Sequence, residues 1–542
     1  MEASSPQDQL SDARELDLEN SGNVGPTWAV TEAVRLRRFL CYGSEGATYS
    51  TKEQPFSLEN ALTLVQLVEG GRGCEVAEEV RRLWPLGGAT CPNASLFALA
   101  VCSQHTDARA KRVALQVLGE LCRVPAQLFA FVQYRKELKG AEHGGMWGRA
   151  LRKAVANWYN GQDALSLANT VTKCKHKAGW SHQDLFRLSH IKPANDAVAL
   201  ISKYVTKGWK AVQETYADRE ISEELVKVFA YLEAVEKAKH LTDELEVVHL
   251  IEEHKLDREQ ILTHHLKSKE VWKALLKDMP VSSLMRHLGK MTADRVLVPG
   301  RPDVAAVCER IQDEQALMKT KTHPFSILVA SENYKRGHGK RGKLKWDPNH
   351  DIVEALDCAF SKCLSNVEGT GRRFLVGVDV SARLGSLALG SSVSTVAVAA
   401  AMSMVILHSE VEAEVLVFSE GAMVPCAISG DTSITQVMAQ LVQAHNCITD
   451  CSLPILWATD NHKMVDVFII FTSNETWFGR ENPAETLRMY RQKTGVFSKL
   501  IVCGMTTNGL SVADPDDRGM LDICGFDSRA VDVIRNFVLD II

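Results

Sequence analysis

Residues 374–385 read "FLVGVDVSARLG", and the sequence pattern of the chain changes at this stretch. An apolar run of phenylalanine, leucine and valine ends at Asp379, and Ser381 follows. Such a run is typical of a buried strand that ends in a loop. A carboxylate and a hydroxyl on that loop suit a hard divalent cation such as Mg²⁺. Because Arg383 stands where a third oxygen ligand is expected, the residues leave three interpretations open: a metal site, a former metal site or a plain strand end.

The sequence after this stretch alternates between short apolar runs and amphipathic segments. We expect strands over 373–380, 414–420, 466–473 and 499–505, and helices over 395–407, 434–444, 483–493 and 528–539. This alternation predicts an α/β doubly wound domain, in which helices cover both faces of a parallel sheet. Ligands of such sheets bind at the carboxyl ends of the strands. Asp379, Ser381 and Ser473 would lie at that edge.

The sequence before this stretch, from about residue 30 to 365, shows helix periodicity almost throughout. Examples are "KRVALQVLGELCRV" (111–124) and "EELVKVFAYLEAVEKAK" (223–239). A long run of amphipathic helices with short links predicts an all-α helical-repeat array, in which each helix pair packs on the next. The expected organisation is multidomain, with a disordered N-terminus over 1–25, a helical module over 26–370 and an α/β domain over 371–542.

Length and composition agree with an intracellular protein of two or more domains. The chain has 542 residues, of which 45% are hydrophobic and 24% charged, as in ordinary globular proteins. Fourteen cysteines without a CxxC pair predict free thiols in a reducing compartment. The polar N-terminus lacks the apolar core of a signal peptide, and no apolar stretch is long enough to span a bilayer. We therefore expect no membrane partner.

Charge is distributed unevenly along the chain, although the formal net charge is only −5. Residues 375–542 contain ten Lys/Arg against nineteen Asp/Glu, whereas residues 135–192 contain eleven Lys/Arg against four Asp/Glu. We call residues 135–192 the basic segment. A local positive field attracts phosphate backbones, so this segment is the candidate RNA-binding site. Its candidate contact residues are Lys136, Lys139, Arg149, Arg152, Lys153, Lys173, Lys177, Arg187, His190 and Lys192.

The spacing of these cations predicts that several share a face. On a helix expected over 147–159, Arg149, Arg152 and Lys153 lie three and four residues apart. Lys173 and Lys177 are likewise expected one helical turn apart. The next helix is expected to begin at an N-cap, Ser181, and to end near Arg187 and His190.

Three tryptophans, at positions 147, 158 and 180, are interspersed with these cations. Aromatic rings can stack on unpaired bases, but packing between helices is the favoured interpretation for all three. For the charges, a solvated helix face is the plain alternative, and the strong local excess of one sign favours function.

A second basic stretch, residues 333–348, contains "GHGKRG", a formal match to GxGxxG. Because a helix and not a strand is expected before it, and no helix begins at its last glycine, we reject dinucleotide binding. We expect a flexible basic loop instead. The sequence contains no GxxxxGK[ST], HExxH or GxSxG motif, and the basic segment lacks clustered carboxylates for two metals. These absences disfavour a hydrolase and a nuclease.

Four long segments resemble the Ro ribonucleoprotein family, whose members have a TROVE module followed by a von Willebrand factor A-like domain (A-like domain). They are "GMWGRALRKAVANWY" (145–159), "DELEVVHLIEEHKLDREQILTHHLKSKEVWKALL" (243–276), "GHGKRGKLKW" (337–346) and "ADPDDRGMLDICGFD" (513–527). The resemblance implies a ring of HEAT-like helical repeats without catalytic activity. It implies binding of Y RNAs on the outer surface and of single-stranded ends of misfolded small noncoding RNAs in a central hole, in small-RNA quality control. We expect these RNA partners, no DNA, and a location in the cytoplasm and also the nucleus.

By this resemblance, the family's basic RNA-contact positions match Lys173, Lys177 and His190, and the other cations of the basic segment are their neighbours. Either lysine could supply the phosphate contact. The alternative function is a helical-repeat scaffold whose A-like domain binds a protein partner. Neutralising these residues separates the two, because RNA affinity depends steeply on salt and charge.

The resemblance also implies an adhesion-type metal site in the A-like domain. Asp379, Ser381 and Thr449 match the family's ligand pattern, whereas Arg383 replaces a serine and Ser473 replaces an aspartate. We expect a degenerate site in which Arg383 pairs with Asp379 in place of the ion. In the alternative, Arg383 turns to solvent, and the three matching residues and Asp450 still hold a weakly bound cation such as Mg²⁺.

Overall fold

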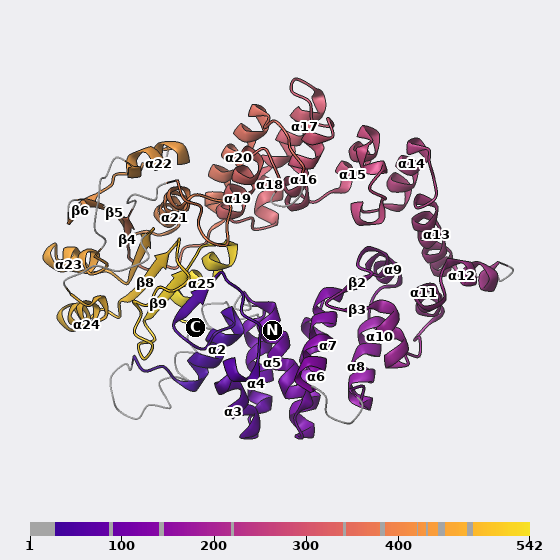
Figure 1. Cartoon of the computed structure of the whole chain (residues 1–542), viewed down its shortest axis with the longest axis horizontal. Helices are drawn as coiled ribbons and strands as arrows, with labels where there is room; N and C mark the ends of the chain where they lie inside the picture. The colour runs from indigo at the N-terminus through magenta and orange to yellow at the C-terminus, as the bar shows by residue number, and fades with distance from the viewer. Residues whose placement is uncertain are drawn as a thin grey trace, which may run out of the picture.

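The computed structural model describes residues 28–85, 90–139, 146–217, 222–339, 343–379, 385–419, 421–429, 432–442, 450–473 and 481–542. The segment 1–25, expected to be disordered, lies outside these residues. The described chain forms a helical half and an α/β half, and Figure 1 shows that they follow one another around a ring.

The helical half is built of α-helices that pack on their neighbours around this ring (Figure 1). Its helices are α2 (Glu32–Tyr42), α3 (Leu62–Glu69), α4 (Gly73–Leu83), α5 (Pro92–Gln104), α6 (Ala108–Leu121), α7 (Pro125–Lys139), α8 (Arg149–Asn160), α9 (Ala164–Lys173), α10 (His182–Ser189), α11 (Asp196–Lys207), α12 (Trp209–Tyr216), α13 (Glu223–Ala238), α14 (Glu244–His254), α15 (Lys269–Asp278), α16 (Val281–Ala293), α17 (Pro302–Ile311), α18 (Glu314–Lys319), α19 (Pro324–Lys335) and α20 (His350–Cys363). The predicted helical-repeat array is thereby confirmed.

Helix α13 illustrates why these segments are helical. Its N-cap, Ser222, accepts a hydrogen bond from the backbone N–H of Leu225. Two glutamates occupy the first turn, where their negative charges interact favourably with the helix dipole. Its apolar positions recur three and four residues apart and are buried against neighbouring helices; they include Leu225, Val228, Leu232 and Val235. Burial of this stripe, more than intrinsic propensity, stabilises the helix.

The α/β half is a seven-stranded sheet with the order β1-β9-β8-β7-β4-β5-β6. The strands are β1 (Thr48–Ser50), β4 (Phe374–Asp379), β5 (Ala413–Ser419), β6 (Ala422–Pro425), β7 (Val467–Thr472), β8 (Lys499–Gly504) and β9 (Met520–Cys524). All neighbours run parallel except β6, which pairs antiparallel with β5. The four expected strands are confirmed, whereas β1, β6 and β9 were not expected.

Helices cover both faces of this sheet, which confirms the doubly wound arrangement. They are α21 (Thr395–Ser409), α22 (Ile434–Val442), α23 (Leu453–Asp460), α24 (Pro483–Thr494) and α25 (Ser528–Val538). One face packs with α21, α22 and α25 into the core that continues through the helical half. The other face packs with α23 and α24 in a separate cluster. Only α23 was not expected from the sequence.

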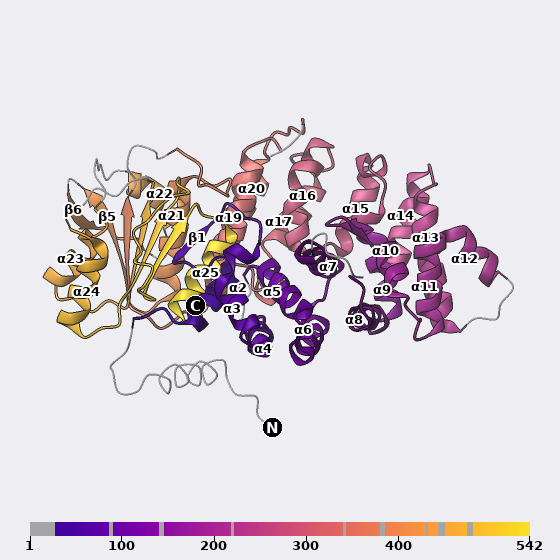
Figure 2. The same cartoon turned by 60° about the horizontal axis from the view of Figure 1, so that its bottom comes forward.

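The α/β half closes the ring, because both ends of the helical half contact it. Strand β1 pairs parallel with β9, and the Tyr49 hydroxyl donates to Asp527 Oδ1 at 2.7 Å. At the other end, the rings of Phe325 in α19 and Phe526 lie 5.3 Å apart. Figure 2, like Figure 1, shows α25 beside α2. The first strand of the sheet thus comes from the N-terminal part of the chain.

The second basic stretch forms a short hairpin in its described part. His338 and Lys345 form an antiparallel bridge, and Trp346 Nε1 donates to the Tyr334 carbonyl at 2.9 Å. The helix α19 precedes this stretch, in agreement with the rejection of dinucleotide binding. Residues 340–342 lie outside the described residues.

Every cysteine that the structure describes is a free thiol, as expected. Within the described ranges, none of the helices combines the length and apolar character needed to cross a bilayer.

Candidate nucleic-acid interface

The basic segment folds into α8, α9, α10 and a small hairpin, with part of α7 beside them. One face of α8 is buried, and its core residues are Leu151, Val155, Trp158 and Tyr159. Arg149, Arg152 and Lys153 are exposed. The prediction that these three cations share a solvent-facing side of one helix is confirmed.

The helical placement of Lys177 was wrong. Helix α9 ends at Lys173, and strand β2 (His176–Lys177) pairs antiparallel with β3 (Trp180–Ser181). Two residues, Ala178 and Gly179, link the strands with φ of 52° and 77°, the positive values that a tight hairpin turn requires. Lys177 is therefore exposed on a hairpin, not one helical turn from Lys173.

Helix α10 begins as predicted at Ser181. The Ser181 hydroxyl accepts from the backbone N–H of Asp184, and the Asp184 side chain accepts from the Ser181 backbone N–H, forming a capping box. The helix ends at His190, which adopts the left-handed conformation. Arg187, His190 and the following Lys192 are exposed. The hairpin joins α9 to α10, and the capping box fixes where α10 begins. The cations of both helices therefore follow one another closely along the chain.

The tryptophans of the segment pack into the protein, as favoured from the sequence. Trp158 is buried and donates to the Cys122 carbonyl at 2.8 Å. Trp180 is buried, donates to Gln133 Oε1 at 3.0 Å and meets the half-buried Trp147 edge to face. Lys136 Nζ lies 5.7 Å from the centre of the Trp180 ring. These rings stabilise the surface from below and leave its charges exposed.

Beneath the exposed cations, Tyr159 and His182 form a buried hydrogen bond of 2.8 Å between the tyrosine hydroxyl and His182 Nδ1. His182 is only 2% exposed, and burial lowers its pKa to about 4. His182 Nε2 has no hydrogen-bond partner. The imidazole is thus held neutral at the start of α10. Nothing in the sequence pattern distinguished His182 from the exposed histidines.

Lys173 forms an ion pair with Asp257. Its ammonium lies 2.6 Å from Asp257 Oδ2, and Asn169 Nδ2 donates to the same oxygen at 3.4 Å. Asp257 precedes the short 3-10 helix η2 (Arg258–Gln260), far from Lys173 in sequence. Sequence reasoning missed this pairing, because no local pattern links residues so distant.

The structure describes only some of the predicted metal-site residues. Asp379 is fully buried at the carboxyl end of β4, and the Thr472 hydroxyl, which was not predicted, donates to Asp379 Oδ2 at 2.8 Å. Ser473 is buried too, and its carbonyl accepts from Thr506. Asp450 Oδ1 accepts from the Ser452 backbone N–H at 2.9 Å. Ser381, Arg383 and Thr449 lie outside the described residues.

Both described carboxylates near this strand end already accept hydrogen bonds from the protein. Of the two carboxylates, Asp379 accepts a threonine hydroxyl and Asp450 caps a turn. In the part of the chain that the structure describes, the one set of three His, Cys, Asp or Glu groups close enough to share an ion is the exposed His350, Asp351 and Glu354 on α20.

Comparison with known proteins places these features in a family. The sequence matches the family model described as "TROVE domain" over residues 19–333 and that described as "Ro60 vWA domain" over residues 373–538. It is 31% identical to "RNA-binding protein RO60" of Caenorhabditis elegans, with 98% of this chain and 91% of that protein aligned. It is 32% identical to the protein of that name in Deinococcus radiodurans, with 98% and 97% aligned. The crystal structure of the Deinococcus radiodurans RO (RSR) protein superposes with a TM-score of 0.84 at 30% identity, covering 94% of this chain and all of that chain.

Proposed function

This chain belongs to the Ro60 family, and we propose on that basis that it is an RNA-binding protein whose ligands are Y RNAs and misfolded or defective small noncoding RNAs. The observation that carries the proposal is the surface formed by α8, α9, α10 and the hairpin between them. It concentrates exposed cations in a chain that is acidic overall. Phosphate backbones are the partners that such a surface attracts most strongly.

The protein acts by binding and not by catalysis. Arginine forks and lysine ammonium groups neutralise successive phosphates, while the buried tryptophans fix the helices that present them. Binding of Y RNA stabilises that RNA, and capture of defective RNAs serves quality control in the cytoplasm and the nucleus. A protein partner of the A-like domain would add to this function without replacing the RNA surface.

The experiment compares two variants of equal charge change. Lys173→Ala/Lys177→Ala removes two cations from the proposed surface, and Lys227→Ala/Lys237→Ala removes two exposed cations from α13, where each pairs with a glutamate one turn away. Affinity for a labelled RNA hairpin with a single-stranded tail is measured against salt. We expect the first variant to bind on the order of tenfold more weakly, with a salt slope reduced by about two.

The control variant should bind like the wild-type protein. If Lys173→Ala/Lys177→Ala keeps full RNA affinity while folded, the assignment of this surface is wrong. If it loses RNA and still binds a protein partner, the two functions belong to different surfaces.

We also propose that the A-like metal site is degenerate, on the support of Arg383 and Ser473, which stand at two ligand positions of the family pattern. Calorimetric titration of the full chain with Mg²⁺ or Mn²⁺ should give no micromolar binding, and Arg383→Ser/Ser473→Asp should restore it. Micromolar binding by the unaltered chain would favour the alternative, in which Asp379 and its neighbours hold the ion.

A further inference from the structure

An aspartate from another part of the helical half contacts the proposed RNA surface. Asp257 lies 84 residues from Lys173 in sequence, yet its carboxylate oxygen is 2.6 Å from the lysine ammonium. The two side chains are 35% and 39% exposed, so solvent and ligands reach both. The ion pair thus engages a lysine of the basic segment that the proposed function needs for contact with a phosphate.

The position of Asp257 is built into the fold. Its side chain and that of Gln260 form a capping box around η2, and Gln260 Oε1 accepts from the Asp257 backbone N–H at 2.7 Å. The buried Gln260 amide also donates to the hydroxyls of Thr172 at 2.7 Å and Tyr231 at 2.6 Å. Thr172 directly precedes Lys173. The same network therefore fastens η2 to the end of α9 and places the carboxylate beside the ammonium.

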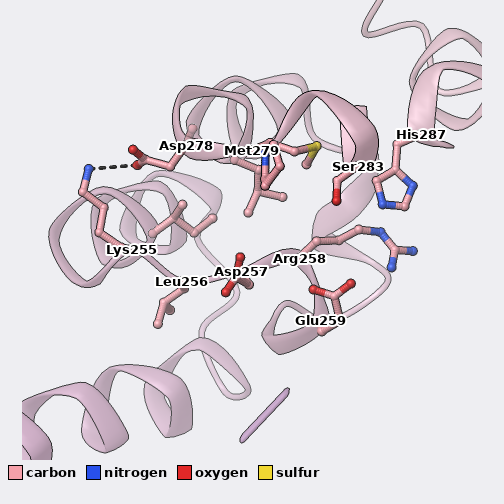
Figure 3. A pocket seen from close by; sticks show the side chains of 13 residues that line it. Lys255, Leu256, Asp257, Arg258, Glu259, Asp278, Met279, Ser283 and His287 are labelled. Atoms are coloured by element: carbon pink, nitrogen blue, oxygen red, sulfur yellow. Dashed lines mark hydrogen bonds and ion pairs between the residues drawn. The ribbon is translucent and has the colours of Figure 1, made fainter. Parts of the chain in front are cut away.

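Asp257 also faces a second group of charged side chains. On its other side it lines a small pocket of about 60 Å³ between α14, α15 and α16, shared with Glu259 and Asp278 (Figure 3). In that pocket Lys255 pairs with Asp278 at 2.9 Å. Lys255 and Arg258 line this pocket together with the carboxylates, so the Lys255–Asp278 pair is an exposed ion pair close to Asp257 that can serve for comparison.

We propose that Asp257 limits RNA affinity by competing with a phosphate for the Lys173 ammonium. An RNA gains the Lys173 contact only when it breaks the pair, and the uncovered carboxylate then repels the nearby phosphate. The pair thereby lowers affinity for RNAs that use Lys173 and leaves binding through the other cations unchanged. This inference rests on the proposed function of Lys173 as an RNA contact.

The test is a double-mutant cycle in the full chain. Asp257→Asn removes the charge and keeps a side chain that caps η2 equally well. Asp278→Asn is the matched control, because it makes the same charge change beside Lys255. Affinity is measured at low salt with the labelled RNA hairpin that carries a single-stranded tail. We expect Asp257→Asn to bind about two- to fivefold more tightly, the range set by exposed ion pairs, and Asp278→Asn to bind like the wild-type protein.

The cycle distinguishes the ways in which the proposed competition can be refuted. In a Lys173→Ala background no ammonium is left to compete for, so Asp257→Asn should give a clearly smaller gain; a full gain there would overturn the proposed competition. Weaker RNA binding by Asp257→Asn would show instead that the carboxylate positions Lys173, and an equal gain from Asp278→Asn would show a general charge effect; either result refutes the proposal. If Lys173→Ala alone leaves RNA affinity unchanged, the premise about Lys173 fails first.

Discussion

His182 should make the proposed RNA surface sensitive to acid. It is buried at the first turn of α10, next to the cap residue Ser181, and its ring hydrogen-bonds the equally buried Tyr159. Burial lowers its pKa to about 4 from the ordinary 6.5. Protonation in the folded protein would place a charge among Phe129, Tyr159 and the core of α8.

The sign and size of the effect follow from linkage. Because the pKa of His182 is lower in the folded than in the unfolded protein, the unfolded chain binds more protons between pH 6.5 and about 4. Stability is therefore complete above pH 6.5 and falls as the pH drops through this window. One pKa unit corresponds to about 1.4 kcal/mol, so the loss is ~2 kcal/mol near pH 5 and ~3 kcal/mol once the ring is protonated in both states.

The assay compares urea unfolding of the wild-type protein, His182→Gln and His350→Gln near pH 7 and pH 5, followed by tryptophan fluorescence. Glutamine does not titrate, and its carbonyl can accept the Tyr159 hydroxyl. His350 is an exposed histidine and provides the control. The wild-type protein and His350→Gln should lose ~2 kcal/mol more than His182→Gln on acidification. Equal losses in all three proteins would refute the assignment of this pH dependence to His182.

Two further predictions concern the sheet. A Cβ at Gly525, where φ is +76°, would collide with Thr51 Oγ1 and the Leu389 carbonyl, whereas Gly495 has a similar φ and no atom within 4 Å. Gly525→Ala should therefore cost ~2 kcal/mol more than Gly495→Ala and speed hydrogen exchange in β1; equal costs would contradict the packing argument. Burial raises the pKa of Asp522 in β9 to about 6 from 3.8, so the folded chain binds more protons there, and protonation stabilises it as the pH falls from 6 towards 3.8. Between pH 7 and pH 4, the free energy of unfolding of Asp522→Asn, measured with urea, should lack ~2 kcal/mol of that gain. If the variant shows the same pH dependence of stability as the wild-type protein, the role of Asp522 is refuted.

The sequence predicted those elements whose signal is local. Strands β4, β5, β7 and β8 are continuous apolar runs, and helices such as α8 and α13 carry clear periodicity, so their predicted ends lie close to the observed ones. The missed strands lack that signal. In β6 only four residues pair, and the last is a proline; in β9 the apolar run is interrupted by the buried Asp522.

The candidate interface was predictable in its chemistry and less so in its geometry. The local excess of cations located the basic segment, but the Ala178–Gly179 turn places Lys177 on a hairpin, whereas helix spacing predicted it one helical turn from Lys173. The partner of Lys173 could not be predicted, because Asp257 reaches it only through the packing of η2 on α9. Pairing between distant residues depends on tertiary structure, which no spacing rule records.

Strand β1 shows why the two halves should be studied together. Its three residues pair with Asp522, Ile523 and Cys524 of β9, and Trp28 packs on the Arg491 guanidinium 3.4 Å from its ring centre. A fragment that begins near residue 371 would lose both contacts and leave one side of β9 without backbone partners. Such an open edge pairs readily with other chains. Metal binding or partner binding measured on that fragment would therefore report a surface that the full chain covers with its own N-terminal strand.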